Sequence, residues 1–332
     1  MEFLVEYGMF LAKFLTVVII FLLVFIVVFI LINKSKSLAE GHLDIKNLNQ
    51  KYEEMNLLLK SHILSKKELK KSIKDFKNRL KSRHKQKTDK NGERKKIFVL
   101  DFKGDIRATE VSSLREEITA LLTIAGEKDE VLVLLESAGG TIHGYGLAAS
   151  QLKRIRDRKI QLTVAVDKVA ASGGYMMACV ANRIIAAPFA IIGSIGVLAQ
   201  LPNFNRFLKK HDIDFEQITA GEYKRTLTLF GENTDKDRKK LKEELEEAHA
   251  LFKDFIGYNR PQVDIDSIAT GEYWYGKKAL EMKMVDELKT SDDYLTHEAT
   301  DADIYELHYV RKKTLGEKIF SMGARLSADI NN

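Results

Sequence analysis

Ser172 has the surroundings of a nucleophile. It follows an apolar run at 162–166 and precedes Gly173, Gly174 and a second apolar run at 175–181. Where a strand meets a helix, a serine hydroxyl is exposed, and the N-terminus of the helix offers backbone N–H groups to an oxyanion. An N-cap serine followed by glycines that permit tight packing would have the same sequence. Spacing alone therefore leaves both interpretations open.

A second glycine turn comes shortly after another apolar run. Residues 131–135 are apolar, and the pair Gly139-Gly140 begins four residues later. Glycine lets a backbone N–H point into a cleft without a Cβ in the way, so this turn could supply a second donor opposite Gly173. A purely structural turn between a strand and a helix would look the same.

A nucleophilic serine also needs a base. Of the eight histidines, three lie within residues 34–96, and His143 is the one that follows a glycine turn. His143 lacks an evident orienting partner, which disfavours a Ser-His-Asp triad. A lysine is the alternative, but it must be neutral, which requires burial to lower its pKa from about 10.4 towards 7–8. Lys224, beside Tyr223 and Thr226, is the candidate, although nearly every lysine is an ordinary surface residue.

The composition excludes several classes of protein. With 332 residues, 45% hydrophobic and 30% charged, the chain is neither disordered nor fibrous and is long enough for more than one segment. The single cysteine, Cys179, excludes an intramolecular disulfide and a cysteine-based metal site, and no motif predicts a metal or another cofactor. Residues 34–96 hold 20 Lys and Arg against 8 Asp and Glu, whereas residues 97–332 hold 32 against 37. The main part of the chain is therefore acidic, which disfavours nucleic acid as a partner.

The N-terminal residues predict a membrane anchor. Residues 14–32 carry no charge and are apolar apart from Thr16. At 1.5 Å per residue this run spans about 28 Å, close to the thickness of a bilayer core. It is longer than the core of a cleaved signal peptide and ends without a small-residue cleavage pattern. We expect an uncleaved anchor at 1–33 and a basic, mostly helical stalk at 34–96, which could be solvated or bind anionic lipid through 66–96.

The orientation of this anchor is left open by the sequence. Lys34, Lys36, Lys46 and Lys51 follow the apolar run, while Lys13 precedes it. The positive-inside rule then places the C-terminal part in the cytoplasm, but long translocated domains can override that bias.

The rest of the chain alternates strand-like and helix-like segments. Strands are predicted at 97–102, 130–136, 162–166, 183–187, 195–199 and 215–219, and helices at 111–122, 145–156, 175–181 and 236–256. This alternation predicts an α/β domain with right-handed crossovers. The apolar stripe of helix 236–256 could pack on its own core or on a neighbouring subunit.

Three motifs resemble the signal peptide peptidase A family of membrane-bound serine peptidases. They are VAASGGYM at 169–176, GSIGV at 193–197 and GEYKRT at 221–226. Further segments resemble the single-unit inner-membrane members of that family: VEYGMFLAK at 5–13, GYGLAASQL at 144–152 and PNFNRFL at 202–208. The resemblance covers the anchor and residues 97 to about 290.

This resemblance implies a fold, a reaction and the residues of a site. The fold would be a ClpP/crotonase-like domain of repeated β-β-α units at 97–315, followed by a C-terminal tail at 316–332. The reaction would be peptide-bond hydrolysis through an acyl-enzyme. By their place in the motifs, the residues would be Ser172 as nucleophile, Lys224 as general base, Gly140 and Gly173 as oxyanion donors, and Ser194 as a hydroxyl that supports the lysine. The chain departs from the family pattern at Ala138, where proline is usual, and at Lys283, which interrupts a Gly-Leu-Val-Asp ending.

The resemblance also implies partners and a location. Substrates would be signal-peptide remnants or unfolded polypeptides, and copies of the chain would form a ring, expected to be an octamer. The catalytic domain would be periplasmic, on the bacterial inner membrane, with no cofactor or metal. Two alternatives stay open: an acyl-CoA hydratase or isomerase on the same fold, and a membrane scaffold with a decayed site that assembles through helix 236–256. Labelling by a fluorophosphonate would separate the first from a peptidase, and intact Ser172 and Lys224 argue against the second.

Overall fold

The structure, a computed structural model, describes residues 2–36, 41–86 and 94–311. The chain divides into two compact units, one of residues 1–44 and 309–332 and the other of residues 45–308. The predicted tail at 316–332 and the end of the predicted stalk at 87–93 lie outside the described residues. The division of the chain at residues 33, 96 and 315 stays a prediction.

The N-terminal segment is one long helix, α1 (Glu2–Lys36). It contains the run at 14–32 that predicts an anchor, and Phe14, Phe21 and Phe25 are exposed along it. In the part of the chain that the structure describes, no helix has the length and apolarity needed to cross a membrane. The anchor therefore stays a prediction.

The strands of the described residues form one sheet of ten. They are β1 (His42–Asn47), β2 (Lys96–Gly104), β3 (Glu130–Ser137), β4 (Gln161–Val166), β5 (Val169–Ala171), β6 (Arg183–Ala186), β7 (Ile191–Gly193), β8 (Tyr273–Tyr275), β9 (Glu287–Leu288) and β10 (Asp303–Val310). Seven follow the order β1-β10-β2-β3-β4-β6-β9, and β5, β7 and β8 form a branch that starts at β3. The pairs from β10 to β9 are parallel, and β7 pairs antiparallel with β8. The predicted α/β class is confirmed as a mixed α/β sheet.

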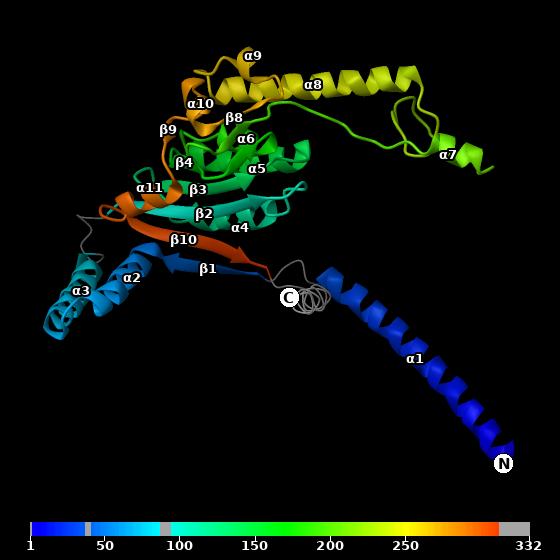
Figure 1. Ribbon diagram of the computed structural model, residues 1–332, viewed down its shortest axis with the longest axis horizontal. Coiled ribbons are helices and arrows are strands. Elements are labelled where there is room, and N and C mark those ends of the chain that lie inside the picture. The colour runs from blue at the N-terminus through cyan, green and yellow to red at the C-terminus, as the bar shows by residue number, and fades with distance from the viewer. Residues whose placement is uncertain (1, 37–40, 87–93, 312–332) are drawn as a thin grey trace. The chain divides into compact units, whose positions relative to one another are not determined.

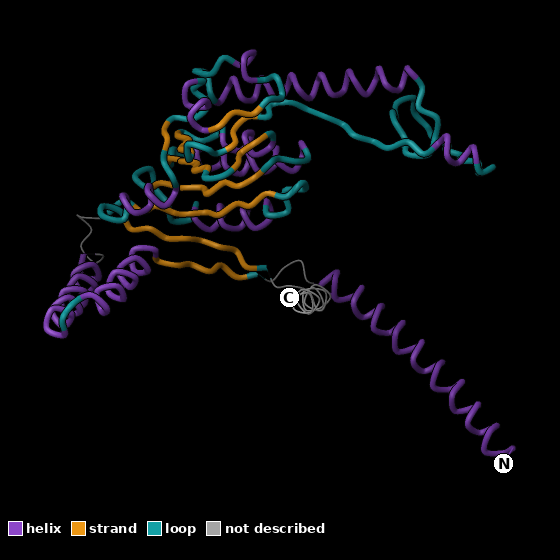
Figure 2. Tube along the Cα trace, viewed as in Figure 1, coloured by secondary structure: helices purple, strands orange, loops and turns teal. Residues whose placement is uncertain are grey.

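Helices lie between most successive strands of the chain, and Figure 2 distinguishes the two by colour. After α1 they are α2 (Leu48–Ile63), α3 (Lys66–Gln86), α4 (Val111–Leu121), α5 (Ile142–Asp157), α6 (Gly173–Ala178), α7 (Asn205–Lys210), α8 (Asp235–Asn259), α9 (Ile265–Ile268), α10 (Gly276–Glu281) and α11 (Ser291–Glu298). Eight of the predicted elements are confirmed at the corresponding positions. They are the strands β2, β3, β4 and β6 and the helices α4, α5, α6 and α8.

The centre of the sheet is apolar on both faces. Val131, Leu132 and Val133 of β3 are fully buried, and Leu114 of α4 and Leu152 of α5 are buried beside the sheet. Parallel strands covered by helices on both faces have this near-continuous apolar sequence. The packing fixes the carboxyl ends of β3 and its neighbours, where the candidate site lies.

Two predicted strands are wrong. Residues 195–199 are not in a strand, because β7 ends at Gly193, where the backbone turns through positive φ at Gly193 (112°) and Ser194 (53°). Ile195 is nonetheless buried, so its side chain packs in the core although the residue is not part of a strand. Residues 215–219 lie in the connection between α7 and α8, outside the sheet.

The connection from β7 to α8 forms an exposed arm, which we define as residues 198–234. In Figure 1 the arm leads from the sheet to α7, and α8 leads back towards α9 and α10. Its exposed large apolar side chains are Leu198, Leu201, Phe204, Phe207, Ile213, Phe215, Ile218, Tyr223, Leu229 and Phe230. Along α8 itself, the buried residues are Phe252 and Ile256, near its C-terminal end.

Part of the predicted stalk joins the sheet. Strand β1 is a member of the sheet, and Asn49 at the start of α2 is buried. The Asn49 amide donates to the carbonyls of Ala299 (3.0 Å) and Ala302 (2.9 Å), and its oxygen accepts from the N–H of Ile304 (2.7 Å).

Candidate active site

The sheet divides at the carboxyl end of β3, and the candidate site lies at this division. Residues 130–134 of β3 pair with β4, whereas Ser137 pairs with Ala170 of β5. In the same branch, Ala171 pairs with Gly193 of β7. Three strands therefore end side by side, and the turns that follow them are brought together. The carboxyl ends of parallel strands are where open α/β sheets bind ligands.

Ser172 lies between β5 and α6 in a strained conformation. Its φ is 52° and its ψ is −118°, a combination that residues with a Cβ rarely adopt. Its N–H donates to the Gly193 carbonyl (2.7 Å), and its carbonyl accepts from the N–H of Met176 (3.0 Å). The side chain is half-buried. A sharp strand-to-helix turn of this kind presents a serine oxygen for nucleophilic attack.

The turn after β3 lies directly against Ser172. Gly139 has a φ of 91°, and a methyl group added to it would lie 2.7 Å from Ser172 Cβ and 2.8 Å from Gly173 N. A methyl group on Gly140 would instead lie 2.6 Å from the carbonyl carbon of Ile106. Both positions therefore require glycine. The sequence singles out the pair, but only the structure reveals that Gly139 is the residue that contacts the serine.

Two backbone donors near Ser172 are available to a ligand. Within residues 94–311, neither the N–H of Gly140 nor that of Gly173 donates a hydrogen bond to another protein group. Two such donors beside a serine are what an oxyanion hole requires.

Ser194 lies in the same place. It follows Gly193, whose carbonyl holds the N–H of Ser172, and its own N–H donates to the Glu272 carbonyl (2.6 Å). Its φ of 53° is again positive. The structure thus brings Ser172, Gly140, Gly173 and Ser194 together.

Lys224 lies apart from this group in a single copy of the chain. It belongs to the part of the arm between α7 and α8, which Figure 1 shows at the end of α8 that lies away from α6. The side chain is exposed, and among the described residues its amine forms no hydrogen bond or ion pair. The neighbouring Glu222 pairs with Lys236 of α8 at 2.5 Å. The sequence motif gives no sign of this separation.

The two departures from the family pattern occupy exposed turns. Ala138 is exposed between Ser137 and Gly139. Lys283 has a φ of 59°, a conformation that favours glycine. Its carbonyl accepts from the Arg260 guanidinium (3.1 Å), which also binds the Asp286 carboxylate through 2.9 and 2.8 Å contacts.

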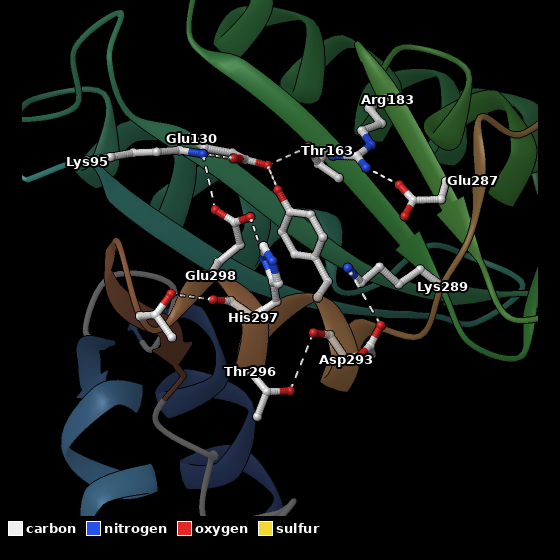
Figure 3. A network of polar contacts seen from close by, with 12 residues as sticks. Lys95, Glu130, Thr163, Arg183, Glu287, Lys289, Asp293, Thr296, His297 and Glu298 are labelled. Carbon is white, nitrogen blue, oxygen red and sulfur yellow. Dashed lines mark hydrogen bonds and ion pairs between the residues drawn. The ribbon is translucent and has the colours of Figure 1, made fainter.

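A second polar cluster lies at the opposite end of β3 (Figure 3). The buried Glu130 carboxylate contacts Lys95 Nζ (2.5 Å) and accepts from the hydroxyls of Thr163 (2.5 Å) and Tyr294 (2.6 Å). Burial raises the pKa of Tyr294, and the hydrogen bond and charge of Glu130 raise it further. This cluster attaches α11 to the sheet, away from Ser172.

The described residues offer no metal site, and one further cavity lies away from Ser172. In residues 2–36, 41–86 and 94–311, no cluster of three or more His, Cys, Asp or Glu side chains could hold a metal ion. A cavity of about 270 Å³ lies between α2 and α3, lined among others by Asn49, Tyr52 and Phe76. It is formed by elements other than those that carry Ser172.

Comparison with known proteins gives the class of the chain. The family model for the N-terminal part of peptidase family S49 matches residues 2–152, and that for peptidase family S49 matches residues 154–305. The chain is a serine-type peptidase on a mixed α/β sheet. It belongs to peptidase family S49.

Two relatives are similar over most of the chain, and one solved structure matches a smaller part of it. A probable protease SohB of Haemophilus influenzae is 49% identical over 325 residues, covering 96% of this chain and 92% of that protein. A probable protease SohB of Buchnera aphidicola subsp. Schlechtendalia chinensis is 49% identical over 304 residues, covering 89% and 99%. A mutant of a membrane-bound stomatin-specific protease, solved with a substrate peptide, matches 70% of this chain and 98% of its own at 13% identity and a TM-score of 0.44.

Proposed function

We propose that this peptidase is a membrane-anchored serine endopeptidase with Ser172 as nucleophile and Lys224 as general base. The observation that carries the proposal is the strained Ser172 at the start of α6, flanked by the unused N–H groups of Gly140 and Gly173. Strain at a serine is retained where the surrounding structure enforces it, and such positions cluster at active sites. We further propose that the sheet and its branch are of the ClpP/crotonase type.

The reaction follows from the roles of these groups. Ser172 Oγ attacks the scissile carbonyl carbon while its proton passes to a neutral lysine amine. The oxyanion that forms is held by the N–H groups of Gly140 and Gly173. The C–N bond then breaks, the leaving amine takes the proton from the lysine, and an acyl-enzyme remains. A water molecule, deprotonated by the same lysine, hydrolyses the ester and restores the serine.

The exposed position of Lys224 supports an assembly of copies. A lysine is neutral near pH 7 only where burial disfavours its charge, and a single copy leaves Lys224 in solvent. The arm also exposes ten large apolar side chains, which a neighbouring copy would cover. We therefore propose a ring in which Lys224 of one copy reaches Ser172 of the next. Ser194, beside Ser172, would hydrogen-bond the incoming amine.

The proposed substrates are unfolded or extended polypeptides near the membrane, including remnants of signal peptides. A ring closed by the arms would admit extended chains and exclude folded ones. The exposed apolar side chains of α1 and the uncharged run at 14–32 support attachment to a bacterial inner membrane. We propose a periplasmic catalytic unit, in line with the family resemblance. The excess of lysines after the apolar run favours the cytoplasm instead. A reporter fused to the C-terminus measures on which side of the membrane this unit lies.

Covalent labelling tests this function. Full-length protein in detergent micelles is treated with a fluorophosphonate, and the modified residue is located by peptide mass spectrometry. Labelling of Ser172 in the wild type, its absence in Ser172→Ala, and cleavage of unfolded casein by the wild type alone are expected. Casein cleavage that persists in Ser172→Ala would remove Ser172 from the mechanism. Membership of a peptidase family favours this outcome over an acyl-CoA enzyme or a decayed scaffold.

A further inference from the structure

Tyr145 of α5 is fully buried between the two turns of the site. Its hydroxyl donates to the Asp105 carbonyl (2.8 Å) and lies 2.5 Å from Ser137 Oγ. Its ring packs against the backbone of Gly173, where an added methyl group would lie 2.6 Å from Tyr145 Cδ2. One side chain thus contacts both Ser137, whose hydroxyl oxygen accepts from the N–H of Gly139, and Gly173, the first residue of α6.

The direction of the hydrogen bonds around Tyr145 follows from the groups involved. A carbonyl only accepts, so the single hydroxyl hydrogen of Tyr145 is committed to Asp105. Tyr145 Oη therefore accepts the hydrogen of Ser137 Oγ, which leaves Ser137 Oγ to accept from the N–H of Gly139 (3.0 Å). The Gly104 carbonyl, at 3.4 Å, is a longer alternative acceptor for Ser137. The bonds form one chain from Gly139 through Ser137 and Tyr145 to Asp105.

This chain holds the peptide between Ala138 and Gly139, which directly precedes the peptide that carries the Gly140 N–H. Because Gly139 gives its N–H to Ser137, the turn is anchored just before Gly140, and the N–H of Gly140 is left for a ligand. On the other side of Gly140, the turn is closed by Ile106, whose carbonyl accepts from Thr141 N (2.8 Å).

The loop that carries Ile106 is itself held by Asp105. Its carboxylate accepts from the N–H groups of Thr109 (2.8 Å) and Arg107 (3.1 Å). The hydrogen bonds to Thr109 and Arg107 hold the pKa of Asp105 below its ordinary value. Asp105 therefore acts on both sides of the turn. Its carbonyl accepts from the Tyr145 hydroxyl, and its carboxylate holds the loop that carries Ile106.

We infer that Tyr145 and Ser137 are positioning residues that aim the Gly140 and Gly173 N–H groups at the oxyanion, an inference that rests on the proposed function of Ser172. Neither side chain touches the reacting atoms; they act through the backbone of Gly139 and Gly173. An oxyanion hole works only when its donors are held in place before charge develops, so loosening the turn slows the chemical step more than it weakens substrate binding.

The test separates kcat from KM in the full-length protein in detergent micelles. Tyr145→Phe keeps the ring against Gly173 and deletes one oxygen, and Ser137→Ala deletes the next oxygen in the chain. For a peptide ester we expect kcat to fall about tenfold in each variant, with KM changed by less than about twofold. The rate of fluorophosphonate labelling at Ser172 should fall in parallel, because the phosphoryl oxygen occupies the same hole. The double variant should be little slower than Ser137→Ala, since both hydroxyls belong to one chain.

Tyr294→Phe is the matched control. Tyr294 is also buried and its hydroxyl also binds a side chain, but that side chain is Glu130 at the opposite end of β3. Its loss should lower the unfolding temperature and leave kcat and the labelling rate per folded molecule unchanged.

Each outcome decides a separate point. Unchanged kcat in folded Tyr145→Phe and Ser137→Ala, with normal labelling of the wild type, would overturn the positioning role and leave the proposed function intact. An equal loss of kcat in Tyr294→Phe would also overturn it, by showing a general effect of core damage. A wild-type protein that is not labelled at Ser172 contradicts the proposed function itself. If Tyr145→Phe does not fold, the kcat and labelling rate of Ser137→Ala alone decide whether the positioning role holds.

Discussion

The N–H of Ser172 donates a 2.7 Å hydrogen bond to the carbonyl of Gly193. This bond joins the turn after β5 to the end of β7, one residue before Ser194. A methyl group added at Gly193 would lie 2.9 Å from the Trp274 ring, so the glycine allows β8 to pack closely against this end of β7. The strained serine is thus held by the branch of the sheet, not by α6 alone.

Gly139→Ala should disable the site. The new methyl group would meet Ser172 Cβ and Gly173 N, and the φ of 91° disfavours any side chain. We expect fluorophosphonate labelling to slow by about 100-fold or more, the typical effect of losing an oxyanion donor. Gly146→Ala on α5 is the control, because nothing lies within 4 Å of an added methyl group there. It should label normally; slow labelling of this control would mean that the assay reports damage to α5.

Glycine should be a more stable replacement for Ser172 than alanine. Ser172→Gly removes the side chain that makes a φ of 52° unfavourable, whereas Ser172→Ala keeps the Cβ and its strain. We expect Ser172→Gly to be more stable than Ser172→Ala by about 1 kcal/mol, measured by chemical denaturation. Both variants should be unlabelled by fluorophosphonate. Equal stability of the two would mean that Ser172 is unstrained in solution.

Mixing two variants that are each expected to be inactive tests whether the proposed dyad spans two copies. Ser172→Ala retains the lysine, and Lys224→Ala retains the serine. When the two are co-expressed, random assembly in a head-to-tail ring should restore about a quarter of wild-type activity. A mixture as inactive as its components would place Lys224 beside Ser172 of its own copy. Lys224→Arg should also be inactive, since a guanidinium stays protonated, whereas Lys210→Arg on the same arm should be active.

Removing Asp286 from the Arg260–Asp286 pair should strongly destabilise the fold. The Arg260 side chain is 3% exposed, and Asp286 also accepts from the N–H of Ile184 (2.7 Å). Asp286→Ala would leave the guanidinium buried without a counter-charge, which costs about 3 kcal/mol or more. Glu246→Ala, which breaks an exposed pair with Lys242, should change the free energy of unfolding by less than about 0.5 kcal/mol. Similar effects of the two substitutions would contradict a buried role for Arg260.

Ionisation of Tyr294 should lower the free energy of unfolding at alkaline pH. Burial and Glu130 raise its pKa above the ordinary value of 10.0, so the folded phenol stays neutral where the unfolded phenol ionises. The stabilisation is therefore complete below pH 10 and is lost as the pH rises beyond it. Urea denaturation between about pH 8 and 11 should give a steeper decline for the wild type than for Tyr294→Phe. Tyr258→Phe, at a 79% exposed position, should keep the wild-type slope.

The sequence predicts the elements of this fold better than their pairing. Apolar runs locate β2, β3 and β4, because buried parallel strands are apolar on both faces. Strand β1 is missed, since His42–Asn47 is mostly polar and only partly buried. The branch at β3 is missed as well, because the pairing of Ser137 with Ala170 is a long-range contact without a local signature.

For the candidate site, the sequence likewise locates residues but not the contacts between them. The motifs locate Ser172, Gly140, Gly173 and Ser194, and the structure brings these four residues together. The contact of Gly139 with Ser172 and the support from Tyr145 depend on the packing of α5 against α6, which periodicity does not reveal. The separation of Lys224 from the others depends on the path of the arm, where exposed apolar side chains do not follow either a helical or a strand period.

The three hydrogen bonds of Asn49 determine where this protein can be shortened. A soluble version that begins at residue 97 would remove the side chain that satisfies the carbonyls of Ala299 and Ala302 and the N–H of Ile304. Each buried backbone group left without a partner costs about 1–3 kcal/mol, a substantial part of the stability of a typical domain. A cut ahead of Ile45 keeps the whole of the larger unit and all three bonds. Limited proteolysis that trims the chain from its N-terminus should therefore stop before α2.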